Sequence, residues 1–187
     1  MIIDLLGRVA ECVYTPRRSI RRLLELGPHR PDIILQMVLL AYVLQVLLFG
    51  LLTDLRPDDR SILEFHFQGV INHVISFIVL GALVFGIGRM FGGQATVADA
   101  FAGVAWIELV FTFLLPMGVV GLLPAEGGEP SGFGALLLLG TVGIGIWMMT
   151  GAVAEIHRFK STWSVFFGLM IVLTIGSLLF MTLVPRA

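Results

Sequence analysis

Charged side chains are scarce in this chain of 187 residues. Asp, Glu, Lys and Arg make up 13% of it, hydrophobic residues make up 57%, and the mean hydropathy is +0.97. A soluble domain carries about 25% charged residues, so this composition excludes a soluble globular protein. Because 12 Lys and Arg residues face 13 Asp and Glu residues, the net charge gives no reason to expect a nucleic-acid partner.

Cysteine is nearly absent as well. Cys12 is the single cysteine, which excludes an intrachain disulfide and any metal site with several cysteines. The histidines are scattered rather than set at metal-ligand spacing, and the motifs Gly-x-Ser-x-Gly, His-Glu-x-x-His and Gly-x-x-x-x-Gly-Lys do not occur. We therefore expect no catalytic residue, no cofactor and no metal, and a protein that is not an enzyme.

Long apolar runs dominate what is present. A transmembrane helix needs about 20 mainly apolar residues to cross a hydrocarbon core about 30 Å thick. The sequence predicts an all-α polytopic bundle, with an amphipathic segment at 1–32 and a five-helix transmembrane domain at 33–187. The five predicted spans are 33–53, 70–88, 101–123, 133–154 and 164–184.

Local signals add detail to these spans. Pro116 predicts a kink in the third span, because proline removes a backbone donor and crowds the preceding turn. Thr96 and Thr162 are candidate N-caps, and Thr15-Pro16 predicts the start of a short helix before the first span.

The basic residues are distributed unevenly between the two sides. Nine lie on the side of the N-terminus and three on the other, so the positive-inside rule predicts a cytoplasmic N-terminus and an external C-terminus. The N-terminal stretch does not have the order of a cleaved signal peptide, and we expect it to be retained. The nine are Arg8, Arg17, Arg18, Arg21, Arg22, Arg30, Arg89, Arg158 and Lys160.

The short N-terminal helix is amphipathic. At about 100° per residue, Arg17, Arg18, Arg21 and Arg22 fall on one side and Ile20 with its neighbouring leucines on the other. We expect it to lie flat at the headgroups, with the leucines toward lipid and the arginines on anionic phospholipids. Docking of a partner protein is the alternative.

Polar residues inside the spans form a candidate site. Glu108 lies in the third predicted span, where an ionised carboxylate costs about 2.5–3.5 kcal/mol. It is either a proton or cation relay, or a binding group for a cationic substrate, or a neutral glutamate bonded to a neighbouring helix and reaching toward Arg89. Asn72 and His73 begin the second predicted span, where we expect interfacial, solvated side chains.

Small residues predict close helix packing, within the chain or against a partner. They are Gly81 and Gly86 in the second span and Gly140, Gly143 and Gly145 in the fourth.

Three segments carry a family resemblance: Tyr14 to Leu24, Met90 to Phe101, and Trp147 to Lys160. With the five spans they resemble the Yip (Ypt-interacting protein) family, in particular its bacterial branch. The resemblance implies a helical membrane bundle without a known cofactor, and for bacterial members a membrane adaptor or accessory subunit.

Eukaryotic members of that family bind prenylated Rab-type GTPases through a long cytosolic N-terminal region. Here about 32 residues precede the first span, and Leu26-Gly27-Pro28 matches only part of the family's Asp-Leu-x-Gly-Pro element. We therefore do not extend GTPase binding to this chain.

Three functions follow as hypotheses. The leading one is a non-enzymatic adaptor or accessory subunit of a bacterial inner-membrane complex, packed against a membrane protein partner or a second copy. The alternatives are a small transporter or channel that uses Glu108, and a membrane-shaping or lipid-handling protein.

Overall fold

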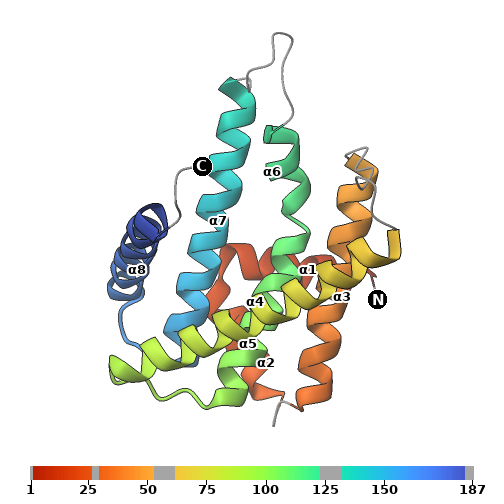
Figure 1. The fold of residues 1–187 in the computed structure, drawn as a ribbon. Coiled ribbons are helices and arrows are strands. Elements are labelled where there is room, and N and C mark those ends of the chain that lie inside the picture. The colour runs from red at the N-terminus through yellow and green to blue at the C-terminus, as the bar shows by residue number, and fades with distance from the viewer. Residues whose placement is uncertain (1, 27–29, 53–61, 123–131, 184–187) are drawn as a thin grey trace.

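The computed structural model describes residues 2–26, 30–52, 62–122 and 132–183 (Figure 1). These residues form helices and no strand, so the predicted all-α class is confirmed. The helices are α1 (Ile2–Tyr14), α2 (Pro16–Glu25), α3 (Pro31–Leu52), α4 (Ile62–Met90), α5 (Val97–Thr112), α6 (Leu115–Leu122), α7 (Gly132–Ile156) and α8 (Thr162–Leu183).

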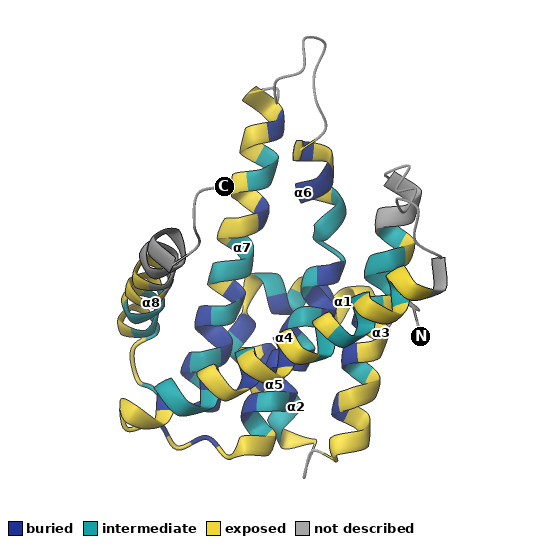
Figure 2. Ribbon diagram, in the orientation of Figure 1, coloured by how far each residue is buried: buried dark blue, intermediate teal, exposed yellow. Residues whose placement is uncertain are grey.

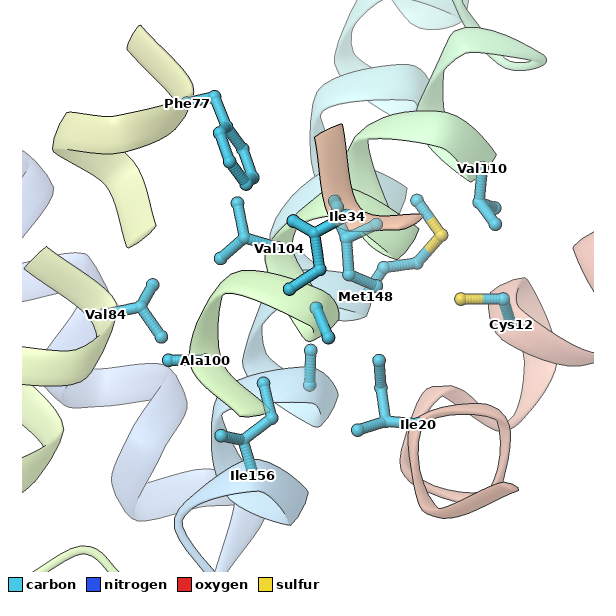
Figure 3. Packing of buried hydrophobic residues seen from close by; sticks show 14 of the residues in the cluster. Cys12, Ile20, Ile34, Phe77, Val84, Ala100, Val104, Val110, Met148 and Ile156 are labelled. Atoms are coloured by element: carbon cyan, nitrogen blue, oxygen red, sulfur yellow. The ribbon is translucent and has the colours of Figure 1, made fainter. Parts of the chain in front are cut away.

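Helix α5 lies at the centre of the bundle. It contacts α2, α3, α4 and α7, and its buried residues point to every side of the helix. Several of them are Ala or Gly, and small side chains let neighbouring backbones approach closely. Figure 3 shows residues from α1, α2, α3, α4 and α7 converging around it, and the outward faces of α4 and α8 are mostly exposed (Figure 2).

Within the described residues, three helices are long and apolar enough to cross a membrane: Pro31–Leu48 of α3, Glu64–Met90 of α4, and α7. The pair α5 and α6 passes the same test as one bent span, which gives up to four. In α8, which runs from Thr162 to Leu183, the described side chains form an apolar stretch at Thr162–Val172 that by itself is too short to count as a span. The chain is therefore a membrane protein, but the predicted count of five spans is not confirmed.

The kink expected at Pro116 is present. Helix α5 ends at Thr112, and α6 begins at Leu115 with a bend of 50° between the two. Thr112 lies four residues before Pro116. In an α-helix its carbonyl would clash with the proline ring and would lack a backbone N–H partner.

The N-terminal helices are packed on the bundle. Ile20 of α2 is fully buried, and Leu23 and Leu24 pack against the same core. The expectation that this apolar face lies in lipid is therefore wrong for Ile20. An amphipathic stripe indicates which face is apolar but not whether lipid or protein covers it.

The other boundaries also differ in part from the sequence prediction. Helix α4 begins at Ile62 rather than at residue 70. Thr96 is confirmed as an N-cap, with a capping box formed with Asp99. For α8 the capping side chain is Ser161 rather than Thr162, because the Ser161 hydroxyl accepts the Ser164 N–H. Thr15 does precede α2, but its hydroxyl donates to the Glu11 carbonyl.

Candidate functional site

Three segments distant in sequence meet at one end of the bundle. They are α2, the loop 91–96 between α4 and α5, and the loop 157–161 between α7 and α8. We call this region the arginine-rich end, because α2 carries four arginines and Arg89, Arg158 and Lys160 border the two loops. The three segments with the family resemblance contribute to it.

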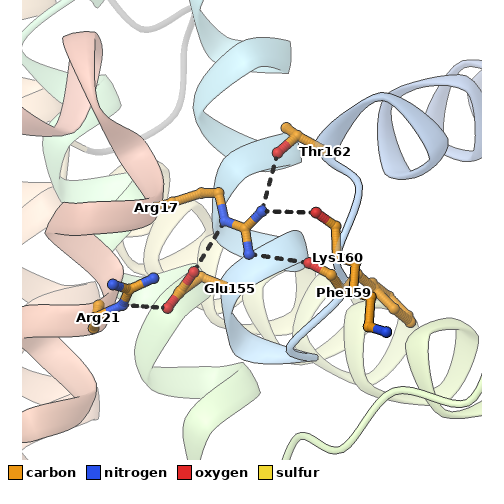
Figure 4. Close-up of polar contacts among 6 residues, drawn as sticks. All are labelled: Arg17, Arg21, Glu155, Phe159, Lys160 and Thr162. Carbon is orange, nitrogen blue, oxygen red and sulfur yellow. Dashed lines mark hydrogen bonds and ion pairs between the residues drawn. The ribbon is translucent and has the colours of Figure 1, made fainter.

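Glu155 connects α2 to α7. Its two carboxylate oxygens accept from Arg17 Nε at 3.0 Å and from Arg21 Nε at 2.7 Å. The other Arg17 nitrogens donate to the Phe159 and Lys160 carbonyls and to the Thr162 hydroxyl (Figure 4). One guanidinium therefore joins the N-terminal helices to the end of α7 and the start of α8.

Glu11 of α1 performs the same role for the other two arginines. Its oxygens pair with Arg18 Nε at 3.2 Å and with Arg22 Nη1 at 2.6 Å. All four arginines of α2 thus have an internal carboxylate partner, and the side chains of Arg18, Arg21 and Arg22 are more than half exposed. Their predicted contact with lipid or a partner protein stays a prediction.

His157 is the most tightly enclosed side chain of this end, with 1% of its surface exposed. Its Nε2 lies 3.0 Å from the Val84 carbonyl, and its ring stacks on Phe159. A Cβ atom added at Gly88 or Gly93 would collide with the imidazole ring. The glycines therefore form a cradle that only a residue without a side chain can provide.

The same region contains two matching helix ends. Gly92 after α4 has φ 82° and Arg158 after α7 has φ 57°. In each case the next residue donates back five positions, from Gly93 to Gly88 and from Phe159 to Ala154. These are Schellman caps, and the Gln94 N–H, which donates to the His157 carbonyl, joins the two loops.

Burial has a clear electrostatic effect on His157. Removal from solvent lowers the pKa of the imidazole, and the nearby Arg89 guanidinium lowers that pKa further. The hydrogen bond to the Val84 carbonyl acts in the opposite direction. The neutral ring, with Nε2 donating to Val84, is the form that this site favours.

A second polar site lies inside the bundle. Glu108 of α5 faces His73 of α4, with 3.8 Å between Oε2 and Nε2, and both side chains are about four-fifths buried. Neither of these two atoms has a hydrogen-bond partner, and neither is exposed. The His73 ring also contacts Tyr42 of α3 and forms a hydrogen bond with the Val38 backbone.

This arrangement changes the sequence interpretation of the site. Because α4 begins early, His73 lies about three turns into the helix, and its side chain is mostly buried rather than solvated. Its place near the membrane interface stays a prediction. Asn72 is exposed on another face and bonds with Gln68. Arg89 donates to the Gly93 carbonyl and does not contact Glu108 among the interactions of the described residues. The structure thus joins two of the three candidates and leaves Asn72 apart.

The glycines with predicted packing roles fall into two groups. A Cβ atom at Gly81 would lie 2.9 Å from the Phe101 ring, and one at Gly145 would lie 2.7 Å from the Phe111 ring. Gly86, Gly140 and Gly143 have no described atom of another element within 4 Å of that position. Packing of these three against a partner stays a prediction.

Glu155, His157 and the Gly88 and Gly93 cradle were missed from the sequence. The predicted fourth span ended at residue 154, immediately before Glu155. A carboxylate next to a span, on a side with nine basic residues, was the available signal. No sequence rule pairs a histidine with glycines more than sixty positions away.

Comparisons with known proteins place the chain in a family. Residues 11–183 match the family model of the Yip1 domain. No curated protein matches the chain. No solved structure matches it. Among the described residues, no group of three or more His, Cys, Asp or Glu side chains could hold a metal ion.

Proposed function

This chain belongs to the Yip1 domain family, and we propose that it is a non-enzymatic integral membrane adaptor or accessory subunit. Its partner docks at the arginine-rich end. We further propose five spans in the cytoplasmic membrane of a bacterium, with this end in the cytosol. The positive-inside distribution of the basic residues supports that orientation.

One observation carries the proposal. Met90 and Phe91, where α4 joins its loop, are 84% and 74% exposed. The loop that follows packs on the His157 ring at Gly93, and the Gln94 N–H donates to the His157 carbonyl. Both contacts fix the loop. This fixed loop presents two large apolar side chains and is bonded through Gln94 to the loop that carries exposed Arg158 and Lys160. Such a surface is typical of a protein interaction site.

Crosslinking in native membranes tests the proposal. A photoreactive amino acid at position 91 is expected to give a reproducible adduct with one neighbour, and Met90→Ser is expected to reduce that adduct severalfold. The matched control places the same probe at Phe133, which is 69% exposed at the far end of α7. A strictly monomeric protein in mild detergent, without an adduct at position 91, would contradict the adaptor role.

The His73 and Glu108 pair supports a second candidate function, a small transporter or channel. Two ionisable groups that face each other inside a membrane bundle are suited to bind and release a proton or cation. Flux through reconstituted vesicles is expected to fall at least about tenfold in Glu108→Gln, in line with the loss of a general acid–base group. Undiminished flux in this variant, or no flux in the wild-type protein, would contradict transport through this site.

A further inference from the structure

A groove of about 560 Å³ lies between α2 and α7. The four arginines of α2 line one wall, Trp147 of α7 lines the other, and Tyr14 at the end of α1 also borders the groove. Trp147 lies about two and a half turns before the end of an apolar helix that is long enough to cross a membrane. The groove therefore has a cationic wall and a wall that belongs to the membrane-spanning part.

The arginines in the groove are held in place but are not saturated. Arg17 uses four N–H donors in its contacts with Glu155, Phe159, Lys160 and Thr162. Arg18, Arg21 and Arg22 each contribute one nitrogen to a carboxylate. A guanidinium has five N–H donors, so each of these three retains donors for a ligand. An arginine oriented by a carboxylate loses little further freedom on binding.

Directed donors matter more here than net charge. Glu11 and Glu155 bridge the arginines, and Glu25 also lines the groove. With these three carboxylates counted, the four arginines leave an excess of one positive charge. Guanidinium groups bind phosphate oxygens through fixed pairs of N–H donors, so a phosphate group fits this wall.

The other wall selects for an amphipathic ligand. The exposed fraction is 79% for Tyr14 and 43% for Trp147, and the Trp147 indole N–H donates to the Val13 carbonyl. Gly151, which also lines the groove, adds no side chain. Trp and Tyr are the residues that proteins place at the boundary between headgroups and acyl chains.

We propose that this groove binds the phosphate of an anionic phospholipid, with the acyl chains passing along Trp147 into the bilayer. The groove shares α2 with the arginine-rich end, but the side chains proposed for partner docking, Met90, Phe91, Arg158 and Lys160, do not line it. Binding there requires no partner protein. The ligand comes from the membrane that surrounds the chain.

Quenching of tryptophan fluorescence tests this proposal on the full-length protein in mixed micelles. The probe is phosphatidylglycerol with brominated acyl chains, and brominated phosphatidylcholine is the neutral comparison. The part of the signal that disappears in Trp147→Phe belongs to the groove. We expect this part to be quenched at a lower mole fraction of the anionic lipid than of the neutral one.

A matched pair of variants separates the groove from general surface charge. Arg22→Gln is expected to raise the mole fraction for half-maximal quenching about fivefold, which is the effect of one basic residue near a membrane. Arg30→Gln removes another exposed, ion-paired arginine on the same side of the bundle but outside the groove, and is expected to leave this value unchanged. Arg18→Gln provides a second groove variant.

Three results would overturn the proposal. The first is equal quenching by the two lipids, and the second is an equal effect of Arg22→Gln and Arg30→Gln. The third is full competition by free glycerol phosphate at concentrations equal to that of the lipid, which would assign the groove to a soluble anion. If the near-ultraviolet circular dichroism spectrum shows that Arg22→Gln alters the tertiary structure, Arg18→Gln is compared with Arg30→Gln instead.

Discussion

At the residue scale, His157 determines how the two loops of the arginine-rich end fit together. Its ring fills the space left by Gly88 and Gly93, and its Nε2 bonds to the Val84 carbonyl. A neutral imidazole can serve as donor to a carbonyl and as packing surface for Phe159. The residue therefore contributes through shape and through its protonation state, and each can be tested separately.

The shape of the cradle gives the first prediction. Gly88→Ala is expected to lower the free energy of unfolding by about 1–3 kcal/mol, the usual cost of forcing extra volume into a packed site. Gly86→Ala, two residues earlier in α4, meets no atom and is expected to leave stability unchanged or slightly raised. Thermal unfolding of the purified variants provides the measurement. Equal losses in the two variants would contradict the fitted cradle.

The protonation state of His157 gives the second prediction. Burial and Arg89 lower its pKa below the ordinary value of 6.5, so the folded protein binds this proton less readily than the unfolded chain. Its contribution to stability is complete above about pH 6.5 and declines as the pH falls below that value, by at most about 1.4 kcal/mol per pH unit. Melting temperature against pH is expected to fall more steeply for the wild type than for His157→Gln. Parallel curves would show that His157 does not titrate on unfolding.

At the element scale, α2 is held on α5 and α7 by a few polar contacts around one buried isoleucine. Ile20 provides the apolar contact, Trp106 Nε1 donates to the Ser19 hydroxyl, and Glu155 bridges two arginines. The first two contacts also attach α2 to α5. The carboxylate bridge joins α2 to α7, next to the close packing of Pro16 on Gly151.

Removal of that carboxylate gives the third prediction. Glu155→Gln is expected to weaken the docking of α2 by about 1–2 kcal/mol, between the value for exposed ion pairs and that for buried charge-assisted hydrogen bonds. Faster hydrogen exchange of the α2 amides is the measurement. Glu11→Gln is the control, because Glu11 also bridges two arginines but lies on α1. An equal increase in both variants would contradict a specific role of Glu155.

The bent pair α5 and α6 illustrates which properties of an element the sequence determines. The bend follows from Pro116 alone, because a proline disrupts the bond to the residue four positions earlier in any surroundings. The burial of α5 on all sides does not follow from its sequence, which is apolar throughout like the lipid-facing helices. Its contacts with six other helices, α1 to α4, α6 and α7, bury it.

At the scale of the whole molecule, the surface is apolar along the helices and basic at one end. The exposed large hydrophobic residues lie mainly on α3, α4, α7 and α8, as expected for helices that face acyl chains. The basic residues gather where α2 and the two loops meet. This polarity sets the orientation that we propose in the membrane.

Labelling from each side of the membrane gives the fourth prediction. A Phe91→Cys variant is expected to react with an impermeant maleimide in inside-out vesicles, and a Phe133→Cys variant in right-side-out vesicles. Cys12 is fully buried, and burial raises the pKa of its thiol, so the background reaction is slow. Labelling of both positions from one side would overturn the proposed orientation.

The sequence by itself determined that this protein is a helical membrane protein, where its main helices lie, and which end is basic. These properties depend on composition and on neighbours along the chain, since hydropathy and proline geometry act locally. Only the tertiary structure decided that His73 faces Glu108, that Glu155 bridges α2 to α7, and that His157 occupies a glycine cradle. Such pairs depend on the register between helices, and in a chain where almost every face is apolar, no local pattern specifies that register.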